Sequence, residues 1–258
     1  MLKAIGSGLR KKLSSTLYNL GFFYNVLKET ARFFSRSQVG YKVLIMQILF
    51  TGYEAMLICT IMAVSIGAAI IVITSNLLPQ FGQGQLMYSI LIVIITRELG
   101  PLLTAFVITA RSGTAIATQL ATMVVAHEIE AYIAVGLNPI SYLVVPRFIG
   151  VVVSMMVLTI YFNIFGLLGS FLVVQLIKPI AISEYLGGLF SILSPGDVLS
   201  GLLKAFVFGI IVSVVSTAQG FAVNRASTEV PVAGIKAVGQ SFIFLLLSDV
   251  IITLVQYA

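Results

Sequence analysis

Residues 95–106, ITRELGPLLTAF, place two charged side chains and two helix-perturbing residues inside an apolar run. Neighbouring side chains on a helix point about 100° apart, so Arg97 and Glu98 do not readily neutralise each other. Pro101 lacks an N–H and removes the normal helical partner of the carbonyl at position 97, and Gly100 lets the backbone bend there. An arginine, a carboxylate and an unpaired carbonyl therefore converge at this point of the chain.

The depth of these groups makes them costly. They lie about 11 residues, or about 16 Å, from the start of the apolar run at residues 86–109. Each charge near the centre of a bilayer costs about 2.5–3.5 kcal/mol, and irregular backbone is tolerated there only against protein or a cavity. We therefore predict that Arg97, Glu98, Gly100 and Pro101 form a polar spot in a substrate cavity. An ion pair between helices or subunits is the alternative.

Other charges in or near apolar runs are interpreted as structural charge partners. Glu54 is expected to meet Arg111 or Arg147, and Asp249 lies in the last apolar run. Lys204 is expected to extend along the helix to the outer interface.

Catalytic chemistry has little support in this sequence. There is one histidine, His127, and one cysteine, Cys59, so no nucleophile–base set or internal disulfide can be assembled. The sequence also lacks a metal-ligand cluster and a GxxxxGK[ST] phosphate loop. We expect no catalytic residue, no metal and no cofactor bound by this chain, and ATP, if used, must be bound by a partner.

The composition indicates that most of the chain is surrounded by lipid. Of the 258 residues 59% are hydrophobic and 9% are charged, against about 25% charged in soluble domains. The long unbroken apolar runs predict an all-α membrane protein rather than a β-barrel, whose segments would alternate. Five spans are expected, at about residues 55–74, 86–109, 148–177, 198–223 and 237–257.

Residues 1–42 differ from the rest because they carry eight of the 15 Lys and Arg residues: Lys3, Arg10, Lys11, Lys12, Lys28, Arg32, Arg36 and Lys42. Their apolar residues, Tyr24 and Leu27 among them, fall in one helical stripe, which predicts a basic amphipathic helix in the membrane interface. A cleaved signal peptide is the alternative, but its apolar residues would be gathered in one compact stretch.

Orientation follows from the Lys and Arg count. With the N-terminus inside, Arg111, Arg147, Arg225 and Lys236 join those eight to make 12 inner basic residues, against Lys178 and Lys204 outside. The N-terminus is thus predicted in the cytoplasm and the C-terminus outside. The inner loop at about residues 112–146 contains helical stretches, and the outer segment ISEYLGGLFSIL predicts a short surface helix.

Two motifs resemble a known family. RELGPLLTAFVITARSGTAIATQLATM and EIEAYIAVGLNPISYLVVPRF are similar to the permease subunit of MlaE/YrbE-type ABC transporters, which work with MCE-domain proteins in moving lipids. The resemblance covers nearly the whole chain. It implies an exporter-like lipid permease, with an elbow helix region at residues 1–42 and a five-helix domain at residues 43–258.

The family also implies partners. These are a second copy of the chain, ABC ATPase subunits that hydrolyse ATP, an MCE-domain ring on the periplasmic side and a small accessory subunit on the ATPase; nucleic acid is not expected. The location would be the bacterial inner membrane, with a role in outer membrane lipid asymmetry. The loop at residues 112–146 would couple to the ATPase through Glu128, Glu130, Gly136 and Pro139.

One alternative from another class is an ion- or proton-coupled secondary transporter with Arg97, Glu98 and Asp249 as relay groups. Such transporters are commonly built from internal repeats. Five spans cannot be halved, and the sequence shows no internal similarity.

Overall fold

The computed structural model describes residues 21–33, 41–78, 86–177, 181–224 and 226–257. Every regular element within these ranges is helical. Five helices are long and apolar enough to cross a membrane: Lys42–Leu77, Leu86–Val125, Ile140–Leu176, Pro195–Phe221 and Glu229–Tyr257. The prediction of an all-α protein with five spans is confirmed.

The spans are mostly longer than predicted, and three contain short irregular turns. The first consists of α2 (Tyr41–Gly52), the 3-10 turn η1 (Tyr53–Ala55) and α3 (Met56–Leu77). The second consists of α4 (Leu86–Ile92), the π-helix η3 (Val93–Leu99), α5 (Gly100–Ile108), the π-helix η4 (Thr109–Gly113) and α6 (Thr114–Val125). The third begins with the π-helix η5 (Ile140–Val144) and continues as α8 (Val145–Ile177).

The remaining elements are α7 (Glu128–Ala134), α9 (Ile182–Ile192), α10 (Pro195–Phe221) and α11 (Glu229–Tyr257). Helix α9 confirms the predicted short helix in the segment between spans three and four. Helix α10 begins with a capping box, in which Ser194 Oγ accepts from the Asp197 amide and the Asp197 carboxylate accepts from the Ser194 amide.

The predicted loop at residues 112–146 is shorter in the structure, because the second span continues to Val125. The reason lies in the threonines of this stretch. Thr114, Thr118 and Thr122 each turn the side-chain hydroxyl back to the carbonyl four residues earlier, so their polar atoms are satisfied within the helix. Only the segment from Ala126 to Pro139, with α7 inside it, separates the two spans.

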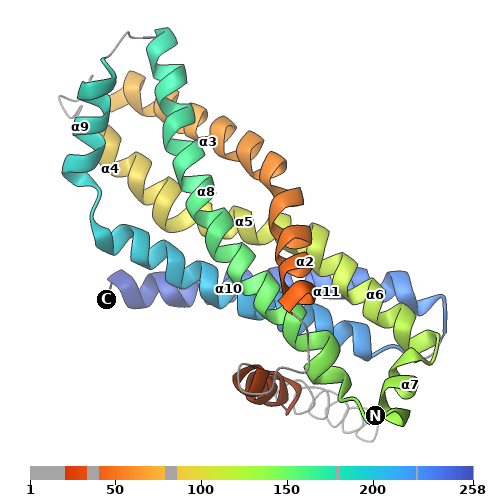
Figure 1. Cartoon of the computed structure of the whole chain (residues 1–258). Helices are drawn as coiled ribbons and strands as arrows, with labels where there is room; N and C mark the ends of the chain where they lie inside the picture. Colours follow the sequence, from red (N-terminus) through yellow and green to blue (C-terminus); the bar gives the residue numbers. More distant parts are fainter. Residues whose placement is uncertain (1–20, 34–40, 79–85, 178–180, 225, 258) are drawn as a thin grey trace, which may run out of the picture.

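Helix α8 lies at the centre of the bundle, where it packs against α2, α3, α5 and α10. Helix α11 packs on the other side, against α10 and α6. Figure 1 shows α9 and the C-terminus at one end of the molecule and α7 at the other. These are called the α9 end and the α7 end below.

The helix at residues 21–33 packs on the bundle at the α7 end. Phe22 and Val26 are buried in a cluster with Val144 and Phe148 of the third span. Tyr24 and Leu27, which belong to the predicted apolar stripe, are exposed. The face that meets the bundle is therefore not the predicted stripe, and the rest of that stripe before residue 21 lies outside the described residues.

Candidate functional site

A buried charge cluster joins three spans. Lys204 Nζ of α10 lies 2.5 Å from Glu98 Oε2 of η3 and 3.0 Å from Asp249 Oδ1 of α11. Lys204 also donates to Thr253 Oγ1 at 2.8 Å, and that hydroxyl lies 3.3 Å from Glu98 Oε2. Two carboxylates thus share one ammonium group, and the cluster carries one excess negative charge.

The prediction that Lys204 reaches the outer interface is wrong, because its side chain is 0% exposed. Glu98 and Asp249 hold the ammonium group inside the bundle. The free-energy cost of this arrangement is lower than that of leaving the two carboxylates buried without a counter-charge. The sequence carried a signal for this. Lys204 falls among the buried small residues Gly201, Ala205 and Gly209, which mark the face of α10 that packs on its neighbours.

Arg97 makes different contacts from its neighbour Glu98. Its Nε lies 3.4 Å from Asp197 Oδ1, an ionic contact without hydrogen-bond geometry, and its guanidinium lies 5.0 Å from the centre of the Tyr257 ring. The expectation that Arg97 and Glu98 do not pair with each other agrees with these contacts. Asp197, Thr253 and Tyr257 are partners that the sequence analysis missed.

The depths of the two charges also differ. Asp197 is the third residue of α10 and Tyr257 is the last of α11, so the Arg97 guanidinium lies at the end of both spans. Lys204 comes nine residues after Pro195, or about 14 Å along the helix. The Glu98 carboxylate therefore meets α10 well inside that helix, whereas the Arg97 guanidinium meets the first turn of α10 and the last residue of α11. The mid-depth position of the two charges stays a prediction.

Gly100 and Pro101 shape the backbone around the cluster. The Gly100 amide donates to the Ile95 carbonyl, five residues back, which defines the π-helix η3. Both residues are buried in the described structure, and their place at a lipid cavity stays a prediction. Gly100 is required by a close approach: a Cβ there would lie 2.4 Å from Asn163 Oδ1 of α8.

The open face of the protomer lies between α3 and α11. Residues 98, 102, 106 and 110 follow a four-residue spacing and share one side of the second span. Ile58 of α3, Phe106 of α5, Ala110 of η4 and Phe242 of α11 line a shallow apolar groove of about 470 Å³ on this face. The Glu98 side chain, 27% exposed, is the polar group along the same stripe.

An ion pair between Arg111 and Glu54 lies at the edge of this groove. Arg111 of η4 also lies over the Phe50 ring, 5.7 Å from its centre. Arg147 is not the partner of Glu54. Its Nη1 donates to the Leu143 carbonyl at 2.8 Å.

The α7 end presents the residues predicted to couple to an ATPase. Glu128, Glu130 and Gly136 are exposed and Pro139 is half-buried, and Glu130 pairs with His127. Gly136 has a φ of 80° and ends α7 in a Schellman motif, in which the Leu137 amide donates to the Tyr132 carbonyl. The exposed apolar residues Ile133 and Val135 complete a protruding surface.

Within the described ranges, no three His, Cys, Asp or Glu side chains gather as metal ligands would. The chemistry of the site is therefore that of charge pairing at the edge of an apolar groove in a membrane helix bundle.

Comparison with known proteins gives the family. The family described as Permease MlaE matches residues 44–255. The chain belongs to the MlaE permease family. A probable ABC transporter permease protein of Rickettsia prowazekii is 32% identical over 211 residues, which cover 82% of each chain. A second, from Rickettsia felis, is 30% identical over 253 residues, or 98% of each chain.

A more distant relative comes from a plant. The protein TRIGALACTOSYLDIACYLGLYCEROL 1, chloroplastic, of Arabidopsis thaliana is 25% identical over 218 residues, which are 84% of this chain and 62% of the relative. As an MlaE-family ABC transporter permease, this chain is a multi-pass transport subunit. The resemblance drawn from its two sequence motifs is confirmed.

Proposed function

We propose that this MlaE-family permease moves phospholipid, or a related hydrophobic lipid, between the inner membrane and an MCE-domain partner. The family and the plant relative, which is named for a galactolipid, support a lipid substrate. The apolar groove and the charged cluster offer the two surfaces that an amphiphile needs.

The observation that carries this proposal is the exposure of charge on the open face. Glu98 is 27% exposed and Asp249 is 17% exposed, on a face where Leu246 and Val250 of α11 are also exposed. A charged group in contact with lipid tails is costly. A second copy of the chain placed over this face would shield the charges from lipid tails and enclose a lipid cavity with polar groups at its base. We therefore propose a homodimer.

The energy would come from a separate ATPase at the α7 end. Exposed acids and exposed apolar side chains occur together there, in a segment that is short and fixed by two turns. With that end in the cytoplasm, the C-terminus and α9 face the periplasm, where an MCE ring would receive lipid. A small accessory subunit on the ATPase and a role in outer membrane lipid asymmetry belong to the same proposal.

A secondary transporter is the second candidate. Two carboxylates around one ammonium group could bind and release a proton, so Glu98 and Asp249 could serve as relay groups. The two candidates differ in what drives transport, which is ATP in the first and an ion gradient in the second.

The deciding experiment is reconstitution with the ATPase in liposomes, followed by ATP-dependent transfer of a fluorescent phospholipid to acceptor vesicles. The Glu128→Lys/Glu130→Lys variant should lose transfer while ATP hydrolysis continues. The matched control is Glu184→Lys, which reverses an exposed acid at the α9 end. Transfer that needs a proton gradient and no ATPase would favour the second candidate.

A further inference from the structure

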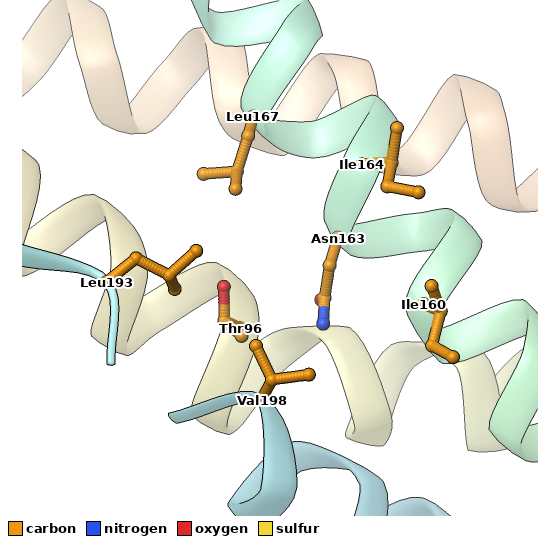
Figure 2. Close-up of a pocket in the computed structure, with 7 residues that line it drawn as sticks. All are labelled: Thr96, Ile160, Asn163, Ile164, Leu167, Leu193 and Val198. Carbon is orange, nitrogen blue, oxygen red and sulfur yellow. The ribbon is translucent and has the colours of Figure 1, made fainter. Parts of the chain in front are cut away.

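The third span changes character along its length. Around its middle, Figure 2 shows Ile160, Ile164 and Leu167 of α8 beside an aliphatic cavity of about 140 Å³. Near the α7 end, the same helix carries a cation, Arg147. A charged side chain in a membrane span is costly unless it meets an opposite charge or water. The groups around Arg147 therefore show whether the chain itself supplies a counter-charge.

Arg147 has no acidic partner in the described part of the chain. The other arginines described there each pair with a carboxylate: Arg32 with Glu29, Arg97 with Asp197 and Arg111 with Glu54. Arg147 forms no such ion pair within the described ranges, and its hydrogen bond runs from Nη1 to the Leu143 carbonyl oxygen. A carbonyl oxygen does not neutralise the charge, so a counter-ion would come from another molecule.

The guanidinium of Arg147 keeps donors for such a group. Its Nε is buried without a partner, but Nη2, which makes no hydrogen bond in the described ranges, is not buried. The side chain as a whole is half-buried. Nη2 carries two N–H groups in the plane of the guanidinium, and that geometry matches the oxygens of a phosphate or a carboxylate. Arg147 can therefore bind an oxyanion that arrives from outside the bundle.

Arg147 faces the seam between α8 and α2. Gly150 of α8 lies against Gln47 of α2, and both helices run away from the α7 end (Figure 1). Arg147 is three residues before Gly150 and Val43 is four residues before Gln47, so both lie on the facing sides, one turn nearer the α7 end. Val43 is 40% exposed. The seam is therefore open beside Arg147.

The nearby acids do not occupy this place. Glu54 and Glu29 pair with other arginines. Glu128 is exposed on the surface of α7, and Tyr132 of the same helix lies within electrostatic range of Arg147. A tyrosine hydroxyl can donate to an oxyanion, but it does not neutralise an arginine. The site therefore offers one cation and one phenol.

The level of Arg147 in the membrane indicates the source of the oxyanion. The span of 37 residues is about 55 Å long, so about 12 Å extends beyond each side of a hydrocarbon core of about 30 Å. Arg147 lies seven residues, or about 10 Å, from the first residue of that span. It is therefore at the edge of the core, next to the lipid headgroups. The helix at residues 21–33, predicted to be interfacial, packs on Val144 and Phe148 at the same level.

A soluble partner does not fit this level. The surface predicted to couple to the ATPase ends at Pro139, and Arg147 is eight residues, or about 12 Å, further along. A protein bound at that surface would have to enter the membrane to reach Arg147, whereas lipid headgroups are present at that level. Basic pockets between membrane helices bind lipid headgroups in this way.

We infer that Arg147 binds the phosphate of a phospholipid in the leaflet at the α7 end, with Nη2 as the donor and the Tyr132 phenol beside it. The acyl chains lie along exposed apolar residues of α2, Val43 and Met46 among them. The lipid supplies the charge that the chain lacks and fills the seam between α2 and α8. The inference rests on the membrane location of these helices and not on the proposed transport.

The test uses the full chain purified in a maltoside detergent, which contains no phosphate. The probes are phosphatidic acid, diacylglycerol with the same acyl chains, and inorganic phosphate, and native mass spectrometry measures the bound lipid. Phosphatidic acid should bind the unmodified chain about tenfold or more tighter than diacylglycerol, as a hydrogen bond to a charged group predicts. The Arg147→Gln variant should lose one tightly bound phosphatidic acid per chain. Arg32→Gln, which changes an exposed arginine already paired with Glu29, should keep it.

Hydrogen exchange locates the bound lipid. Exchange at residues 137–147 should slow with phosphatidic acid and not with diacylglycerol, and Arg147→Gln should abolish the effect. Equal slowing by both lipids in the unmodified chain would overturn the inference, and this comparison does not depend on any variant folding. Displacement of the lipid by millimolar inorganic phosphate would assign the site to the free ion and overturn it too. Unchanged lipid binding by Arg147→Gln, with loss of ATPase co-purification, would assign Arg147 to a carboxylate of the partner instead.

Discussion

Two ion-pair clusters in the described part of the chain contain the same kinds of groups in opposite surroundings. At the α9 half, Lys204 is 0% exposed between Glu98 and Asp249. Towards the α7 end, Arg111 and Glu54 are 29% and 45% exposed. Both clusters belong to helices long and apolar enough to cross a membrane. Burial, rather than residue type, sets how much each one contributes to stability and how it can act.

A buried cluster is costly to break, because removing one member leaves an uncompensated charge in the interior. An exposed pair exchanges its partner for water with little change in free energy. The buried cluster joins η3, α10 and α11 in one arrangement, whereas the Glu54–Arg111 pair lies at the edge of the apolar groove.

The largest effect is expected when Lys204 is changed to Met. The variant leaves Glu98 and Asp249 facing each other without a counter-charge, which should lower the free energy of unfolding by about 3–5 kcal/mol. Thermal unfolding in detergent, followed by circular dichroism, measures the loss. The triple variant Lys204→Met/Glu98→Gln/Asp249→Asn should recover much of it, since no charge is left in the bundle. A triple variant no more stable than the single one would contradict the account.

The second effect comes from the glycine that positions the cluster. Gly100→Ala would place a Cβ 2.4 Å from Asn163 Oδ1 and 2.5 Å from the Ile95 carbonyl oxygen. The overpacking should cost about 1–3 kcal/mol and move η3 away from α8. Gly239→Ala is the matched control in α11, because nothing lies within 4 Å of its Cβ position. That control should be neutral or gain about 0.5–1 kcal/mol. Similar Tm values for the two variants would show that Gly100 has no packing role.

These contacts mark the limit of what the sequence predicts. The five spans could be predicted because long runs of apolar residues indicate helices that are surrounded by lipid. The pairing of Lys204 with Glu98 and Asp249 joins residues far apart in the chain, so no local pattern specifies it. The predicted loop began too early because Thr114, Thr118 and Thr122 are polar residues, although their hydroxyls bond to their own helix.

The sequence indicated which residues belong to the site more readily than it indicated the role of each residue. Arg97 and Glu98 were singled out because charges in an apolar run are costly, and that reasoning holds wherever their partners lie. Gly100 and Pro101 were predicted to line a cavity, but sequence does not show which face of a kinked helix is covered. Only the position of α8, with Asn163 against Gly100, decides this.

A small effect is expected from Glu54→Gln. The variant removes the partner of Arg111, but the arginine keeps its contact with the Phe50 ring and with the Phe50 carbonyl oxygen at 3.5 Å. An exposed ion pair contributes about 0–1 kcal/mol, so the Tm should fall by much less than in the Lys204 variant. A Glu54→Gln loss as large as that of Lys204→Met would remove the distinction between the two clusters.

The smallest effect is expected at Glu29, in the helix at residues 21–33. Its carboxylate accepts a hydrogen bond from Ser141 Oγ and pairs with Arg32, 52% exposed, at 3.2 Å. The Ser141 hydrogen bond, assisted by Arg32 and opposed by partial burial, holds the pKa of Glu29 below its ordinary value of 4.5. Because the pKa is lower in the folded state, the contribution to stability is present above pH 4.5 and is lost as the pH falls through the folded-state value. Ser141→Ala should therefore lower the Tm slightly at pH 7. It should have no effect at a pH below the pKa values of Glu29 in both the folded and the unfolded state. A Tm difference that grows on acidification would show that Glu29 is not the group concerned.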